Sequence, residues 1–187
     1  MSKLLPVMSK KRIHRLRDKL LERGRPTLYP GAGDTRESGQ APPMSGESRP
    51  AASPELNALA ERVKPFAEVM YLVLAADKAI SDRERALLRG GLRSLTDGAL
   101  STAAMADMMD EFERSRERDG VDMRLDFVAS ALYADRADAR LALGLATAAA
   151  DADRGIGTEE RELIDALGER LGISRIEVQE MLQGATG

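Results

Sequence analysis

Apolar and polar residues along this chain recur with the period of α-helices, and no segment alternates as a half-buried strand would. The first helix is expected to begin at Ser53-Pro54-Glu55, where a serine N-cap precedes a proline at the first helical position. Pro65 is expected to break or restart that helix, because proline removes a backbone hydrogen bond. Residues 66–77 are apolar on nearly all sides and should form a buried central helix.

The later helices are predicted from their caps and glycine stops. Ser81 opens a helix that runs to about Leu95 and stops at Asp97-Gly98. Its interior pair Gly90-Gly91 indicates close helix packing, since each glycine costs about 1 kcal/mol relative to alanine. The other predicted helices span residues 101–118, 122–134, 138–151, 158–171 and 174–183. The predicted fold class is all-α, a compact bundle of about seven or eight short helices.

Composition supports this fold and narrows the chemistry. Aromatic residues make up only 3% of the chain and tryptophan is absent, so the core must use the aliphatic residues and methionine that packed helices favour. The absence of cysteine excludes disulfides and thiolate metal sites. The single histidine, His14, lies in an arginine-rich tail, which argues against zinc chemistry and a His-based triad. The side chains expected in the core include Met105, Met108, Met109, Met123, Tyr71 and Tyr133.

The chain divides into a basic amphipathic arm at 1–25, a Gly/Pro/Ser-rich linker at 26–53 and a helical domain at 54–187. Residues 1–52 carry a charge balance of +6 and residues 53–187 one of −9. Residues 8–23 place an apolar stripe among seven Lys/Arg residues, which favours an anionic membrane surface or an acidic partner. The alternatives are a solvated tail, a clamp on the domain's own acidic face and, least favoured because the arm has no aromatic residue, nucleic acid.

The most informative motif occurs twice. Residues 76–85 and 152–161 both read Ala-Asp-x-x-Ile-x-x-x-Glu-Arg, and the alignment extended to 88 and 164 contains six identities in thirteen positions. Each copy is expected to join the end of one helix to the start of the next. If the two corners meet across a pseudo-twofold axis, five carboxylates gather in one acidic region that suits a hard divalent cation (Ca²⁺, Mg²⁺ or Mn²⁺) or a basic partner. These candidate ligands are Asp77, Glu84, Asp151, Asp153 and Glu160.

Four of these five residues also have a structural explanation, whereas Asp151 adds weight to the functional one. Ser81-Asp82-Arg83-Glu84 has the spacing of a capping box, and Glu160 can cap in the same way if Gly157 is the N-cap. Asp77 and Asp153 are placed in the last helical turn, where a carboxylate opposes the helix dipole, although they could also bind loop amides or neighbouring cations. The segment from Asp151 is not an EF-hand loop, because glycine stands at its fifth position and Ile156 at its sixth.

The duplicated motif in this helical context resembles the TerB (tellurite-resistance) superfamily, which includes the domain attached to some membrane-anchored DnaJ-like co-chaperones. The resemblance covers about residues 55–185, and the matching positions are Asp77 and Glu84 in the first half and Asp153 and Glu160 in the second. It implies a cytoplasmic stress-response domain that binds a divalent metal and acts in complexes at the inner face of the membrane. Lys78 and Arg154 depart from the family's usual glycine, and no His-Pro-Asp motif of a J-domain is present.

The sequence therefore predicts a non-enzymatic domain, for which two functions remain open. The first is a metal-responsive TerB-like stress-response module whose acidic motifs are the ligands. The second is a metal-independent adaptor whose acidic face binds a basic partner. An enzyme is not expected, because carboxylates in helical loops come without an activating base or cofactor motif. Protein partners, some of them membrane-associated, and a cytoplasmic or peripheral inner-membrane location are expected.

Overall fold

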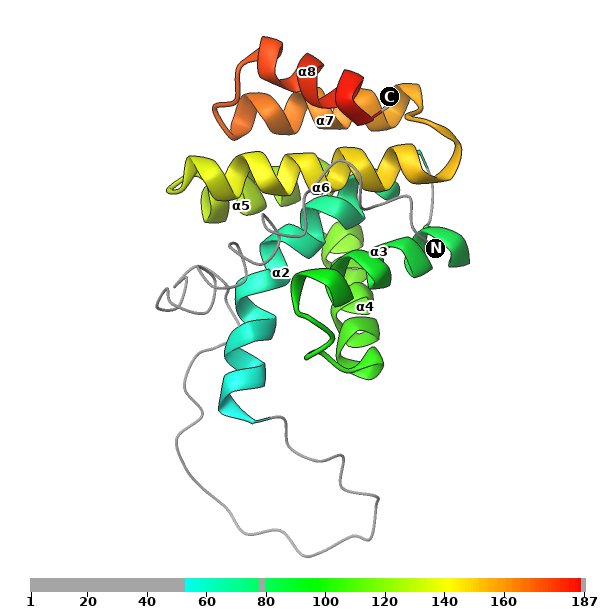
Figure 1. The fold of residues 1–187 in the computed structure, drawn as a ribbon, viewed down its shortest axis with the longest axis vertical. Helices are drawn as coiled ribbons and strands as arrows, with labels where there is room; N and C mark the ends of the chain where they lie inside the picture. The colour runs from blue at the N-terminus through cyan, green and yellow to red at the C-terminus, as the bar shows by residue number, and fades with distance from the viewer. Residues whose placement is uncertain (1–52, 78–79, 186–187) are drawn as a thin grey trace, which may run out of the picture.

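The structure is a computed structural model that describes residues 53–77 and 80–185, without the side chains of Asp153, Arg154 and Ala185. This part of the chain contains seven α-helices and no strand, which confirms the all-α fold class (Figure 1). The predicted arm at 1–25 and nearly all of the predicted linker lie outside the described residues. None of the described helices is long and apolar enough to cross a membrane.

Two long helices form the centre of the domain: α2 (Pro54–Leu74) and α6 (Arg136–Arg154) pack against each other. The N-cap of α2 is Ser53, whose hydroxyl accepts a hydrogen bond from Leu56 N at 3.3 Å, as the sequence predicts. The prediction of a break at Pro65 was wrong, because α2 continues through that residue. Residues 63–74 of this helix are all buried, and their packing outweighs the one backbone hydrogen bond that proline removes.

The remaining helices pack around this pair. α3 (Asp82–Leu95) and α7 (Thr158–Arg170) follow the two copies of the repeated motif. Each contacts the other half as well as its own: α3 packs on α6, and α7 packs on α2. Equivalent motif positions have equivalent surroundings, since Leu88 in α3 and Ile164 in α7 are both completely buried. The helices that follow the two copies of the motif therefore pack into the core in equivalent ways.

Three helices complete the bundle. α8 (Arg175–Ala185) covers α6 and α7, whereas α4 (Thr102–Asp119) and α5 (Val121–Leu132) lie against α2 (Figure 1). Met105, Met108 and Met109 of α4 are buried, which confirms their predicted core role. The same prediction was wrong for two residues, because Met123 is 63% exposed and Tyr133 is 67% exposed. Met123 lies on the exposed side of α5, and Tyr133 lies just after the end of this helix. The apolar face of α5 is therefore narrower than its composition indicated.

Ion pairs as well as apolar contacts join α2 to α4 and α5. Lys64, buried in α2, donates to Glu111 Oε1 of α4 at 2.5 Å. Glu68, one turn further on, is completely buried and accepts from Arg124 Nε of α5 at 2.7 Å. The guanidinium of Arg124 also lies 4.4 Å from the centre of the Phe127 ring. Buried charges of this kind require partners, so the positions of α4 and α5 are fixed by them.

Candidate functional site

The first copy of the motif forms the corner between α2 and α3. Because α2 ends at Leu74, Asp77 is an exposed loop residue, and its predicted place in the last helical turn was wrong. Ser81 is the N-cap of α3, and its hydroxyl accepts a hydrogen bond from Glu84 N at 3.3 Å. The Glu84 side chain returns the interaction by accepting from Ser81 N at 2.6 Å. The predicted capping box is thus confirmed, and Glu84 is buried in it.

The second copy forms the corner between α6 and α7. Glu160 accepts a hydrogen bond from the N-cap amide of Gly157 at 2.7 Å, as predicted for this glutamate. Glycine has no side chain to return the interaction, so this box has only one of its two bonds. Asp151 is half-buried in the last turn of α6. Asp153 belongs to the same turn, but its side chain lies outside the described part.

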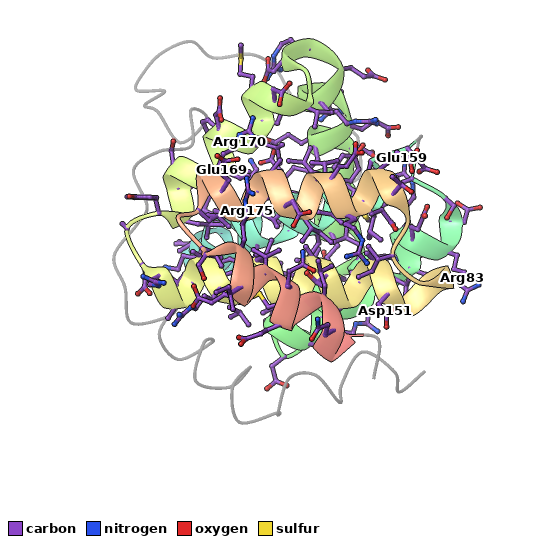
Figure 2. The ribbon with its side chains drawn as sticks, turned by 90° about the horizontal axis from the view of Figure 1, so that it is seen from above. Arg83, Asp151, Glu159, Glu169, Arg170 and Arg175 are labelled. Carbon is purple, nitrogen blue, oxygen red and sulfur yellow. The ribbon has the colours of Figure 1, made fainter. Side chains whose placement is uncertain are left out.

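The two corners lie at the same end of the bundle. The starts of α3 and α7 and the end of α6 meet there in both views, with Arg83, Asp151 and Glu159 labelled in the second (Figures 1 and 2). Among the described side chains, however, no three acidic residues or histidines are grouped so that they could hold a metal ion. The metal site made of Asp77, Glu84, Asp151, Asp153 and Glu160 therefore stays a prediction.

The role of the two motif glutamates is clearer. In each copy one carboxylate oxygen is committed to a backbone amide at the start of a helix, where the four free amides and the helix dipole favour a negative charge. The Glu84 carboxylate is also buried, so a hydrated cation has little access to it. The structure thus gives Glu84 and Glu160 a local stabilising role at the corners.

A second acidic feature lies on α7 and escaped the sequence interpretation. Glu162, Asp165 and Glu169 are spaced three and four residues apart, which places them on one face of the helix, and all three are exposed. None of the three makes an ion pair with another described residue, whereas the neighbouring Arg170 donates to Asp126 at 2.6 Å and Asp122 at 3.0 Å of α5. We call Glu162, Asp165 and Glu169 the α7 acidic stripe. Its i, i+3, i+7 spacing was the signal in the sequence.

An acidic stretch on α4, made of Asp107, Asp110, Glu111 and Glu113, is exposed to solvent only in part. Asp107 and Asp110 are exposed, but Glu111 and Glu113 are half-buried. Glu111 pairs with Lys64, and Glu113 accepts from Arg85 of α3 at 3.0 Å. These carboxylates serve helix packing, which leaves the α7 acidic stripe as the more accessible set of negative charges.

One buried polar group in the core, a tyrosine hydroxyl, makes no hydrogen bond within the described part of the chain. The Tyr71 hydroxyl, in the last turn of α2, is buried and makes no hydrogen bond with any described group. Its ring packs against Phe112 of α4 with the ring centres 5.8 Å apart. Burial raises the pKa of the Tyr71 hydroxyl above its usual value, and the nearby carboxylate of Glu113 acts in the same direction, whereas the nearby guanidinium of Arg116 opposes both.

Comparisons with known proteins do not assign this site. No family model, no curated protein and no solved structure matches the chain.

Proposed function

We propose that this chain is a non-enzymatic, TerB-like stress-response domain that works as a protein-interaction adaptor, binding a basic partner through the α7 acidic stripe and requiring no metal. The observation that carries the proposal is that two sets of carboxylates have different roles. The motif glutamates cap helices, whereas the α7 acidic stripe is exposed and makes no ion pair within the described residues. The proposed TerB-like character is supported by the duplicated motif together with the all-helical fold.

Charge supports a basic partner. The described domain lies within the segment whose charge balance is −9, and rows of like charge on one helix face steer an oppositely charged surface toward it. Glu162, Asp165 and Glu169 offer three carboxylates along nearly two helical turns, a length that matches a short basic helix or strand. Exposed charges at the edge of an interface act mainly on the rate of association, and salt screens them. The affinity for the partner should therefore fall as the salt concentration is raised.

The experiment compares two triple variants in co-purification from the native host with a chelator present. The first, Glu162→Gln/Asp165→Asn/Glu169→Gln, removes the α7 acidic stripe. The matched control, Glu55→Gln/Glu61→Gln/Glu117→Gln, removes the same number of charges from α2 and α4. We expect a partner that is retained by the wild type and the control and lost by the first variant. Equal recovery of that partner with both variants would refute the proposal.

A metal-responsive module is the second candidate, because one observation favours it. The two corners lie at one end of the bundle, and Asp77 is exposed there. In this version Asp77, Asp151 and Asp153 would supply the oxygen ligands that Ca²⁺, Mg²⁺ or Mn²⁺ prefer. Calorimetric titration of the chain with each of the three ions distinguishes the candidates, since the adaptor predicts no heat of binding.

A further inference from the structure

Two large apolar side chains are mostly exposed at the end of the bundle opposite the duplicated corners. Tyr133 follows α5 and is 67% exposed, and Ile176 stands in the first turn of α8 and is 74% exposed. The α5–α6 and α7–α8 turns lie together at this end, on the left of the first view (Figure 1). A Cβ atom on Gly172, in the α7–α8 turn, would stand 3.5 Å from Cε2 of Tyr133, so the ring lies beside that turn. Among the large apolar side chains of the described residues, these two are the most exposed.

The charged groups at this end are mainly acidic. Glu169, in the last turn of α7, and Glu180, on α8, are exposed and make no ion pair with another described residue (Figure 2). Glu177 accepts from Arg136 at 3.1 Å and also from Arg140. Five carboxylates stand here with three arginines, namely Asp135, Asp138, Glu169, Glu177 and Glu180 with Arg136, Arg140 and Arg175. The charge therefore favours a positively charged occupant. We call Tyr133, Ile176, Glu169 and Glu180 the acidic tip.

A segment that covers the acidic tip must combine apolar side chains with positive charge, and residues 8–23 of the same chain have both. Ile13, Leu16 and Leu20 are three and four residues apart, a spacing that places them on one face of a helix. The segment also contains seven Lys/Arg residues and only two carboxylates. Its pattern and its charge are thus complementary to those of the acidic tip.

From this complementarity we propose that residues 8–23 bind the acidic tip of their own chain as an amphipathic helix. The apolar face of that helix covers the two apolar side chains, and its basic side chains pair with the two exposed carboxylates. An arginine beside the Tyr133 ring adds a cation–π contact. Elsewhere in the described residues, Met123 is the only large apolar side chain that is more than half exposed. The acidic tip is therefore the one described surface that offers this segment a pair of apolar contacts among carboxylates.

The connection to the domain is long enough for this contact. Residues 24–53 can span at most about 100 Å when fully extended. The helix α2, which begins directly after them, contains 21 residues and is about 32 Å long, a length comparable with the diameter of a domain of this size. Because both partners belong to one chain, binding is intramolecular, and modest complementarity is enough to populate it. The contact needs no external protein, so it can hold or fail independently of the basic partner proposed above.

The absence of native cysteine allows a direct test with the full chain. A nitroxide label on Ser9→Cys, at the start of the segment, should broaden the amide NMR signal of Gly172 and leave that of Asp82, at the opposite end of the bundle, sharp. A mixture of labelled chains without ¹⁵N and unlabelled chains with ¹⁵N should show no broadening. Broadening in the mixture would assign the contact to a second copy of the chain. That result, equal broadening at both ends of the bundle, or none at all would overturn the proposal.

Variants of the labelled chain identify the groups in contact. Leu16→Ser/Leu20→Ser removes the apolar face of the segment and keeps its charge, and Tyr133→Ala/Ile176→Ala removes the apolar pair of the acidic tip. Both should abolish the broadening at Gly172, and high salt should reduce it because salt screens the attraction. The matched controls, Leu28→Ser/Tyr29→Ser and Met123→Ala, should retain it. Broadening that survives in either of the first two variants would contradict the contact.

Discussion

Glu68 in the middle of α2 and Arg124 in α5 form a buried ion pair, with Arg124 Nε 2.7 Å and Nη2 2.6 Å from Glu68 Oε1. The pair joins residues 56 positions apart in the sequence. It connects the central helix to the α4–α5 segment, because Arg124 also donates to Asp119 Oδ2 at 3.3 Å at the end of α4. Its strength should therefore decide how firmly that segment is held.

Arg124→Met should destabilise the domain by about 3 kcal/mol, since it removes a cation that pairs with the completely buried carboxylate of Glu68. Chemical denaturation gives the difference in free energy of unfolding. Arg118→Ala is the control, because Arg118 is exposed and its loss leaves the bond between Arg124 and Asp119 in place. Comparable destabilisation by both variants would show that the buried pair has no special role.

The stability that Asp119 provides should depend on pH. Hydrogen bonding and charge from Arg118, with a smaller contribution from Arg124, hold the pKa of Asp119 below its usual value. A carboxylate with a lowered folded-state pKa stabilises the fold above the unfolded pKa of about 3.9, and this contribution is lost as the pH falls through the folded value. Asp119→Asn should thus be less stable than the wild type at neutral pH, with a difference that narrows in acid. A difference independent of pH would contradict this.

Two helical glycines should respond oppositely to alanine. A Cβ at Gly90 meets nothing within 4 Å, so Gly90→Ala should stabilise the domain by about 0.5–1 kcal/mol through helix propensity. At Gly168 the new atom would stand 2.6 Å from Cγ2 of Val178, a stiff β-branched side chain in α8. Gly168→Ala should therefore lower the melting temperature, and a rise in both variants would mean that α8 is easily displaced.

Tyr71→Phe tests the buried hydroxyl that makes no hydrogen bond with a described group. Its removal should leave the stability unchanged or raise it by about 1 kcal/mol, because no bond is lost and a desolvated polar group disappears. Urea denaturation of both proteins at neutral pH measures this change in stability. A clear loss of stability would reveal a hydrogen-bonding partner, such as a buried water molecule.

Local signals in the sequence predicted the helices and both motif caps. Ser81 and Glu84 are three residues apart, so their capping box depends only on neighbouring backbone. The ends of helices and the exposure of side chains were harder to predict, because they depend on packing between residues that are far apart in the sequence. Pro65 stays inside α2, where its neighbours are buried, and Tyr133 is exposed just after the end of α5. The pairing of Glu68 with Arg124 carried no local signal at all.

The central claim is that the motif glutamates cap helices and bind no metal, and the melting temperature in millimolar Ca²⁺, Mg²⁺ and Mn²⁺ tests it most directly. Glutamine can replace glutamate in a capping box, so Glu84→Gln/Glu160→Gln keeps the caps while removing both charges. We predict that none of the three ions changes the melting temperature of the wild type and that this variant melts close to it. A ligand at 100 times its dissociation constant adds about 2.7 kcal/mol. A metal-dependent rise in the wild type that the variant lacks would contradict the claim.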